Sequence, residues 1–370
     1  MKWKSLSLES TLIFKGIAIL MIATHNFMHL FPYPKENEFD FSLERTTSLL
    51  HRLWSQPENT LQTIPSFFGH FGVQVFMLLS AYGLTKKYLK SKPDYWPFIW
   101  QRAIKIYPAF IIAIIIWLTL EGFYSFGLFG PVKMLNLHFE DILLKLTLVS
   151  NFIPGKALAP IGPWWFIPFI FQFYLIFPWL LKAYERWQEI GFIALSVFSL
   201  VLAGILQGEI RGVNIYFTIL PYLPVLSLGI YLAKSDSSDI NIPKSLIFLS
   251  LVLFILGNIN QYLWVLTHIS FILVFMVFLN YVIPKIKNNT RKALIFTGKI
   301  SMAIFLVNGF LRFPMARWAI AYDNWLMTIG LCLVFLVITY MVALVLHKTE
   351  QEIFRRLKNY NLKKASQTFT

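Results

Sequence analysis

The chain of 370 residues is strongly apolar, with 57% hydrophobic residues, only 14% charged residues and a mean hydropathy of +0.61. Soluble domains are about a quarter charged, so this composition excludes a soluble globular enzyme and a disordered chain. The formal net charge is +15, and the single cysteine, Cys332, excludes a disulfide framework and cysteine-based metal centres. Apolar runs of about 20 residues without strict alternation predict spanning helices and not a barrel. The sequence therefore predicts an all-α, polytopic helical membrane protein.

Hydropathy divides the chain into ten expected membrane spans. We expect residues 1–347 to form a single transmembrane domain and residues 348–370 to form a C-terminal tail. No cleavable signal peptide is expected, because the first apolar run is long enough to span a membrane and lacks an Ala-x-Ala site. The expected spans are residues 12–31, 67–85, 104–125, 164–181, 191–208, 213–233, 245–262, 264–283, 296–313 and 325–347.

The distribution of charge predicts the orientation of these spans. With the N-terminus inside, the cytoplasmic segments hold most of the Lys and Arg residues, and both termini are then cytoplasmic. Because the basic residues are spread over short loops, the net charge of +15 indicates topology and not nucleic-acid binding. The two longest connections, 32–66 and 126–163, are then external, and connections of this length often carry function. The first of them contains the acidic residues Glu36, Glu38, Asp40, Glu44 and Glu58.

The first span carries polar side chains on one helical face. Lys15, His25 and His29 fall within about 80° of one another at 100° per residue. His25 lies about 15 Å deeper in the membrane than Lys15 at a rise of 1.5 Å per residue. Histidine exchanges protons near neutral pH, so His25, with His29 as the second candidate, is predicted to be catalytic. The alternatives are interhelical hydrogen bonding and a metal pair. No metal is expected, because acidic residues are missing from mid-membrane.

Basic residues gather on the cytoplasmic side of the second and third spans. The positive-inside bias alone explains such a cluster. It also predicts a site for the phosphates of a cytoplasmic donor, since Arg binds phosphate in a bidentate manner. The residues predicted to bind this donor are Lys15, Lys86, Lys87, Arg102 and Lys105.

Aromatic and polar residues toward the outer ends of other spans are candidates for binding a substrate at the outer face. Polar groups in spans usually face a cavity or the bundle interior, so packing and hydrogen bonds within the bundle are the alternative. Tryptophans at the membrane edge also form interfacial belts. The candidates are His70 in the second span, Trp164, Trp165 and Gln172 in the fourth, and Asn308 and Arg312 in the ninth.

Five segments, taken in this order, resemble the acyltransferase-3 family of integral membrane acyltransferases. The resemblance covers nearly the whole chain. The segments are Lys15-Gly-Ile-Ala with His25, Gly72-Val-Gln-Val-Phe-Met-Leu-Leu-Ser-Ala-Tyr-Gly83, Arg102-Ala-Ile-Lys-Ile-Tyr-Pro108, Trp165-Phe with Tyr174 and Pro178, and Gly298-Lys-Ile-Ser-Met-Ala-Ile-Phe-Leu306.

The resemblance implies transfer of an acyl group, acetyl in the simplest case, from cytoplasmic acyl-CoA to a hydroxyl of a surface carbohydrate at the outer face. It implies that His25 is the catalytic histidine, acting as a general base or through an acyl-imidazole. It also implies a bacterial cytoplasmic membrane, with lipid, acyl-CoA and carbohydrate as partners and no permanently bound cofactor. The alternative function is a transporter or flippase for a glycan or a lipid-linked saccharide. The lack of a visible inverted repeat counts against that alternative.

Overall fold

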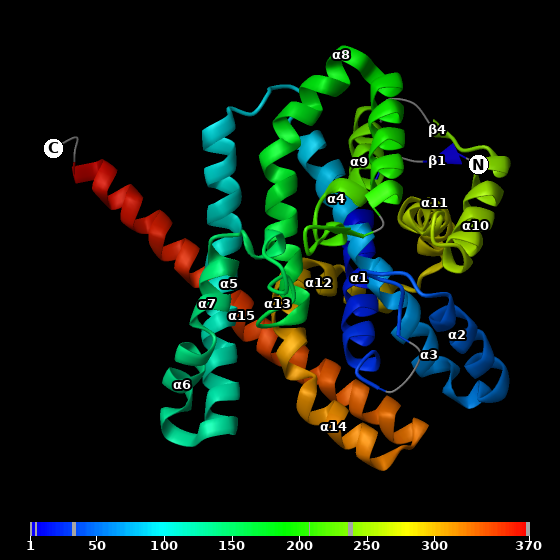
Figure 1. Cartoon of the computed structure of the whole chain (residues 1–370). Helices are drawn as coiled ribbons and strands as arrows, with labels where there is room; N and C mark the ends of the chain where they lie inside the picture. The colour runs from blue at the N-terminus through cyan, green and yellow to red at the C-terminus, as the bar shows by residue number, and fades with distance from the viewer. Residues whose placement is uncertain (1, 4–5, 32–34, 207, 236–239, 368–370) are drawn as a thin grey trace.

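The structure is a computed structural model that describes residues 2–3, 6–31, 35–206, 208–235 and 240–367. It is almost entirely helical (Figure 1), which confirms the expected helical class. Two short antiparallel strand pairs occur in the described residues, β1 (Lys2–Trp3) with β4 (Ile240–Asn241) and β2 (Glu209–Ile210) with β3 (Val213–Asn214). The helices are α1 (Leu8–Met28), α2 (Leu43–Ser55), α3 (Thr60–Phe68), α4 (Gly72–Lys87), α5 (Tyr95–Phe126), α6 (Gly130–Leu137), α7 (Phe139–Leu146), α8 (Phe166–Leu206), α9 (Leu223–Lys234), α10 (Lys244–Ile259), α11 (Thr267–Val282), α12 (Asn288–Lys299), α13 (Ser301–Leu311), α14 (Phe313–Tyr322) and α15 (Trp325–Gln367).

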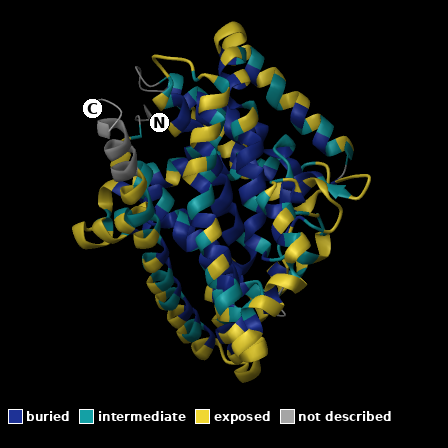
Figure 2. Cartoon of the chain, turned by 90° about the vertical axis from the view of Figure 1, so that its left-hand side faces the viewer, coloured by how far each residue is buried: buried dark blue, intermediate teal, exposed yellow. Residues whose placement is uncertain are grey.

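Among the described residues, 6 helical segments are long and apolar enough to cross a membrane, or 7 if the bent pair α12 and α13 is one span. Helices α9 and α10 are apolar but shorter. The count of ten spans and the cytoplasmic position of both termini therefore stay predictions. Large apolar side chains such as Ile115, Phe198 and Val345 are exposed, and Figure 2 shows exposed residues along the outer faces of the helices. Such an apolar exterior is typical of a surface that faces lipid.

The expected fourth and fifth spans are the two limbs of α8. The backbone leaves helical geometry at Gln188, where φ is 48° and ψ is −142°. Figure 1 shows α8 rising to the top of the view and turning back down. This helix therefore supplies two antiparallel limbs with a turn and no loop between them.

Two expected spans differ from the structure. The sequence places the sixth at 213–233, but the chain there first forms β3 and 3₁₀ turns, and α9 begins only at Leu223, after Pro221. The ninth is expected as one span at 296–313, but α12 and α13 meet at a bend of 77°. Next to this bend, a Cβ atom on Gly298 would lie 2.0 Å from the Leu12 carbonyl oxygen. The glycine therefore permits a close contact between α12 and α1 that the hydropathy of this segment does not predict.

The two long connections and the tail have helical structure of their own. The first connection contains α2 and α3, and the second contains α6 and α7. The expected tail, 348–370, is not separate from the last span as far as it is described, because α15 continues without a break to Gln367.

Helix α1 lies inside the bundle and packs against α4, α12 and α13 (Figure 1). Its N-terminus is capped by Ser7, whose hydroxyl accepts a hydrogen bond from the Ser10 amide. A Cβ atom on Gly16 would lie 2.3 Å from the Leu294 carbonyl oxygen, so α1 and α12 touch through their backbones. This central position surrounds the polar face of α1 with other helices.

Candidate functional site

His25 is held in one orientation near the end of α1. Its Nδ1 lies 2.9 Å from the backbone carbonyl oxygen of Ser66 in α3. A carbonyl oxygen only accepts hydrogen bonds, so Nδ1 carries the proton and donates, and Nε2 keeps the free lone pair. The ring is buried, at 3% exposed. The Ser66 carbonyl thus presents Nε2 as the basic atom of His25.

Two carboxylates from the first long connection face that lone pair. His25 Nε2 lies 3.9 Å from Glu36 Oε1 and 3.8 Å from Glu38 Oε2. Glu36 Oε1 is also 3.4 Å from Nδ1 of His29, and the His25 and His29 rings are stacked with centroids 5.1 Å apart. Negative charge at these distances stabilises an imidazolium, so the cluster strengthens His25 as a proton acceptor.

The two glutamates respond differently to their surroundings. Burial would raise the pKa of Glu36, but the interactions with His29 and His25 outweigh it and hold that pKa well below its usual range. Burial raises the pKa of Glu38, against the opposing effect of His25. Glu36 is therefore the firmly ionised member of the pair.

His70 approaches the cluster from the 3₁₀ turn Gly69–Phe71 that precedes α4. Its ring meets that of His25 edge to face, with centroids 5.6 Å apart. Neither ring nitrogen of His70 has a hydrogen-bond partner among the described residues, although the side chain is buried. The structure therefore brings His70, a predicted acceptor-side residue, next to His25.

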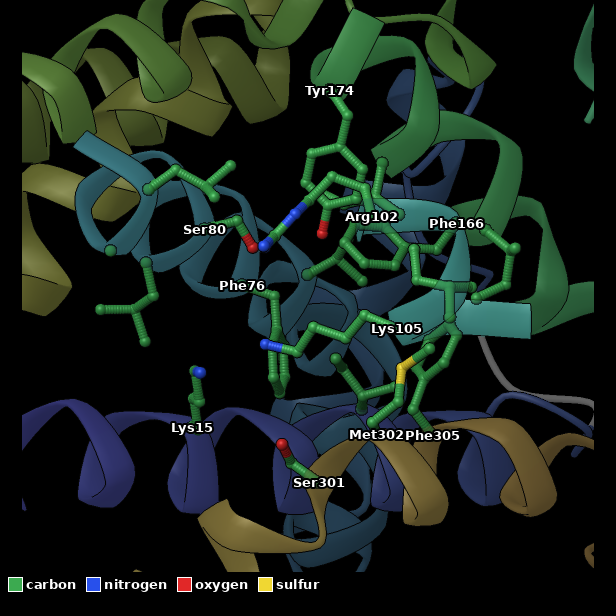
Figure 3. A pocket seen from close by; sticks show the side chains of 18 of the residues that line it. Lys15, Phe76, Ser80, Arg102, Lys105, Phe166, Tyr174, Ser301, Met302 and Phe305 are labelled. Atoms are coloured by element: carbon green, nitrogen blue, oxygen red, sulfur yellow. The ribbon is translucent and has the colours of Figure 1, made fainter. Parts of the chain in front are cut away.

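A cavity of about 450 Å³ opens beneath this cluster, between α1, α4, α5, α8 and α13 (Figure 3). Four predicted donor-binding residues line it: Lys15, Lys87, Arg102 and Lys105. Its other walls are largely apolar and include Ile22, Phe76, Ile167 and Phe305. Ile22 lies about one helical turn before His25 on the same face of α1. The cavity thus combines cationic side chains with an apolar lining that reaches the turn below His25.

Arg102 is the most constrained of these cations. Only 9% of it is exposed, and its guanidinium carbon lies 5.5 Å from the Phe98 ring centroid and 6.0 Å from that of Tyr174. Its Nε has no hydrogen-bond partner in the described part of the chain. Figure 3 shows the guanidinium pointing into the cavity toward Ser80, with the Lys105 ammonium also directed inward. A buried guanidinium with a free donor is suited to bind an anion such as phosphate.

Lys86 differs from its neighbour Lys87. It is not among the residues that line the cavity, and its Nζ lies 5.7 Å from the ring centroid of Tyr82. Adjacent residues on a helix point about 100° apart, so the rotation of α4 decides which lysine faces the cavity. The structure therefore separates two residues that the sequence treats alike.

The two predicted acceptor tryptophans lie in the core. Trp164 is fully buried, and its Nε1 donates to the Leu306 carbonyl oxygen at 2.8 Å. Trp165 packs edge to face against Phe39, with ring centroids 5.3 Å apart. Neither tryptophan belongs to an exposed belt, because the turn that precedes α8 folds into the bundle. Both indoles therefore serve packing in this structure and present no open face to a sugar.

Gln172 makes hydrogen bonds inside the bundle. Its Nε2 donates to the Phe217 carbonyl oxygen at 3.4 Å, and its Oε1 accepts from the Ile219 amide at 3.3 Å. These bonds tie the first limb of α8 to the segment that leads into α9. The buried amide thus finds its partners in a distant segment.

Asn308 and Arg312 join α13 to α1. Asn26 donates through Nδ2 to Asn308 Oδ1 at 2.6 Å, and Arg312 Nη1 donates to the Asn26 carbonyl oxygen at 2.6 Å. The Nε of Arg312 is buried without a partner among the described residues. Arg312 also interacts electrostatically with Glu36 and Glu38. It therefore balances part of the negative charge around His25.

The cluster also contains a possible metal geometry. His25, His29 and Glu36 each offer one ligand atom, and these atoms lie within 4.8 Å of one another. The sequence predicts no metal here, because acidic residues are missing from mid-membrane. The structure places Glu36 beside the two histidines, because the first long connection folds back onto α1. The proton chemistry proposed below does not need a metal.

Sequence reasoning did not assign Glu36 and Glu38 to the site. The signal that pointed toward them was the acidic character of a long connection that the sequence predicts to be external. No helical period relates this connection to α1, so the sequence did not reveal which of its five acidic residues meets His25.

The comparison with protein families matches residues 13–347 to the model of the acyltransferase-3 family, which is described as an acyltransferase domain. The match spans all the site residues described above, from Lys15 to Arg312. It confirms the resemblance carried by the five sequence segments. Neither the comparison with curated proteins nor the comparison with solved structures finds a match.

Proposed function

Because this chain belongs to the acyltransferase-3 family and is an O-acyltransferase, we propose that it transfers an acyl group from cytoplasmic acyl-CoA to a hydroxyl of a cell-envelope carbohydrate. Acetyl is the simplest acyl group, and the membrane is a bacterial cytoplasmic membrane. The family match favours this enzyme over a transporter. One observation carries the proposal: a cavity with cations and an apolar lining ends one helical turn from an oriented histidine.

The cationic side chains suit the phosphates of the donor. Arg102 offers an unpartnered Nε and a planar fork, and Lys15, Lys87 and Lys105 add positive charge around the same space. The apolar lining suits the pantetheine arm and the acyl group. In this arrangement the thioester reaches His25 by passing Ile22, and the nucleotide stays among the cations.

The chemistry then needs one base and one leaving thiolate. His25 Nε2 removes the proton from the acceptor hydroxyl while the oxygen attacks the thioester carbon. The carbon–sulfur bond breaks, an ester forms, and the CoA thiolate takes up the proton held by His25. A general base of this kind contributes about 10²–10⁴-fold to the rate.

The surrounding charges support this proton transfer. Glu36 and Glu38 stabilise the imidazolium that His25 becomes after it accepts the proton. The positive charge of Arg312 offsets part of the negative charge of Glu36 and Glu38. His29 is 30% exposed, so the cluster meets solvent on the side from which an acceptor would enter.

The test is turnover by purified protein in lipid nanodiscs. Wild type should release free CoA from acetyl-CoA, slowly by hydrolysis and faster with an acceptor. His25→Ala should lower this release by about 10²–10⁴-fold. His51→Ala is the matched control, because His51 is an exposed histidine of α2 outside the cluster.

Two results would contradict parts of the proposal. CoA release by His25→Ala at the wild-type rate would exclude His25 as the base and would assign that role to His29. No binding of acetyl-, succinyl- or longer acyl-CoA by folded wild-type protein would exclude an acyl-CoA donor.

A further inference from the structure

The side chains of His25, His29 and Glu36 bring three atoms that can bind a metal close together. One ligand atom from each residue lies within 4.8 Å of the other two. No other group of three or more His, Cys, Asp or Glu side chains does so in the described part of the chain. The imidazoles come from the end of α1 and the carboxylate comes from the first long connection, so the group is assembled only in the folded protein.

The types of these ligand atoms and their separations fit a tetrahedral zinc site. His29 Nδ1 lies 3.4 Å from Glu36 Oε1, and His25 Nε2 lies 3.9 Å from the same oxygen. Ligand atoms that are each about 2.0–2.2 Å from a zinc ion stand about 3.4 Å apart at tetrahedral angles. Two imidazoles and one carboxylate are also a known ligand set for zinc. Small rotations of the side chains would therefore bring all three atoms to bonding distance.

The two histidines form the rigid half of this site. They stand one helical turn apart, and side chains at i and i+4 lie on the same face of a helix. The His29 amide donates to the His25 carbonyl oxygen at 2.9 Å, and the two rings are stacked with centroids 5.1 Å apart. A pair of histidines with this spacing holds zinc in helices that carry the H-E-x-x-H motif. The helix thus fixes two of the three ligands before the connection supplies the third.

The hydrogen bond between His25 and Ser66 also suits a metal ligand. Histidines that bind metals nearly always donate their other ring N–H to a carbonyl or a carboxylate, which fixes the tautomer and the direction of the ring. His25 Nδ1 lies 2.9 Å from the Ser66 carbonyl oxygen, so its Nε2 presents a lone pair toward Glu36. The tautomer that a base needs is therefore also the tautomer that a metal needs.

The charge of the cluster and its access to solvent favour a cation as well. The carboxyl groups of Glu36 and Glu38 face only one guanidinium, that of Arg312. Glu36 Oε2 is buried and has no hydrogen-bond partner among the described residues, so this carboxylate has a free oxygen. The His29 side chain is 30% exposed, which gives an ion a path from solvent.

We propose that His25, His29 and Glu36 bind one divalent transition-metal ion, zinc above all, and that the bound ion blocks the base. Imidazole ligands select zinc over magnesium and calcium, which prefer oxygen ligands. A zinc ion on His25 Nε2 occupies the lone pair that would accept the proton of the acceptor hydroxyl. The metal site stands apart from the proposed function, and only the block of acyl transfer rests on it.

The experiment titrates zinc into tag-free protein in nanodiscs, in competition with a chromophoric chelator. Thermal unfolding and CoA release are measured on the same samples, and magnesium is the control metal. His29→Ala and Glu36→Gln each remove one ligand, and Glu36→Gln also keeps the volume of the side chain. His51→Ala and Glu44→Gln are the matched controls, because both residues are exposed in α2 outside the cluster.

We expect wild type and both control variants to bind one zinc ion and to unfold at a higher temperature with zinc, because an ion that binds only the folded state stabilises it. His29→Ala and Glu36→Gln should bind zinc at least about 10–100-fold more weakly, since even the loss of a hydrogen-bond partner behind a ligand costs this much. Zinc should stop CoA release by wild type, and magnesium should not. Equal zinc affinity in wild type and both ligand variants, or undiminished CoA release with zinc bound, would overturn the proposal.

Zinc binding is measured without substrate, so it is tested separately from acyl transfer. Zinc affinity that depends on His29 and Glu36, in protein that releases no CoA, would support the metal site and contradict the proposed function. CoA release that depends on His25, together with zinc affinity that is the same in both ligand variants as in wild type, would do the reverse.

Discussion

Gly69 stands so close to His25 that a Cβ atom on residue 69 would lie 2.6 Å from the Cβ atom of the histidine. The same atom would lie 2.7 Å from the Met21 carbonyl oxygen. The turn that begins α4 is therefore in backbone contact with α1. This contact brings both the Ser66 carbonyl and the His70 ring to His25.

Gly69→Ala should misplace His25. The new methyl group forces the turn and α1 apart, which costs about 1–3 kcal/mol in stability. A displacement of about 1 Å at a catalytic group lowers the rate about 10²-fold. CoA release and thermal unfolding in nanodiscs measure both effects. Gly330→Ala, where a Cβ atom meets nothing within 4 Å, should match wild type in both. A fully active Gly69→Ala would show that this contact does not position the base.

Glu38→Gln should lower kcat and leave the KM for acyl-CoA nearly unchanged. The carboxylate stabilises the imidazolium formed during transfer, and a charged interaction of about 1.5–3 kcal/mol corresponds to about 10–100-fold. The kinetics of acceptor-dependent CoA release separate the two constants. Glu58→Gln, in the same long connection, serves as the control for loss of a glutamate. A rise in donor KM with normal kcat would place Glu38 in donor binding instead.

Arg102→Ala should raise the KM for acyl-CoA about 10–100-fold, because a charge-assisted hydrogen bond of about 1.5–3 kcal/mol to phosphate is lost. Arg102→Lys should restore only part of the affinity for acyl-CoA, since an ammonium group lacks the planar fork of a guanidinium. The rate of CoA release, measured at increasing concentrations of acetyl-CoA, gives the KM of each variant. Lys90→Ala, an exposed lysine at the same side of the protein, is the control. An unchanged KM in Arg102→Ala would remove Arg102 from the donor site.

Glu36 should make stability depend on acid pH. Its pKa is lowered from the usual 4.5 by His29 and His25 against the effect of burial. The folded state therefore binds this proton less readily than the unfolded state. The stabilisation is fully present above pH 4.5 and is lost as pH falls through the folded pKa.

Thermal unfolding of nanodisc samples across this pH range measures the effect. Glu36→Gln should be less stable than wild type at neutral pH, and the difference should shrink on acidification. Glu44→Gln, an exposed glutamate of α2, should follow wild type. If the difference in stability between wild type and Glu36→Gln grows on acidification, the interaction of Glu36 with His29 and His25 is contradicted.

Much of what the structure gathers around the cationic cavity could be predicted from the sequence. Hydropathy indicates helices that cross a membrane, and the helical period places Lys15 and His25 on one face of α1. The order of the family segments then points to Arg102. These are local properties, because helix period and apolar length depend on neighbouring residues in the chain.

The surroundings of the residues expected to bind an acceptor could not be predicted in the same way. Trp164 and Trp165 resemble a membrane-edge belt in sequence, but the turn before α8 carries them into the core. Gln172 hydrogen-bonds to the segment before α9, and Asn308 accepts a hydrogen bond from Asn26 in α1. Whether a polar or aromatic side chain is free for a substrate depends on partners far away in the chain.

The sequence by itself determined a helical membrane protein, its family, and a histidine above a lysine on one helix, because composition and periodicity are written along the chain. The tertiary structure alone decided that Glu36 and Glu38 meet His25, and that Lys87 rather than Lys86 lines the cationic cavity. Helix rotation and the path of an irregular connection are set by packing between distant segments. In this protein, glycines that allow backbone contact at Gly16, Gly69 and Gly298 set much of that packing.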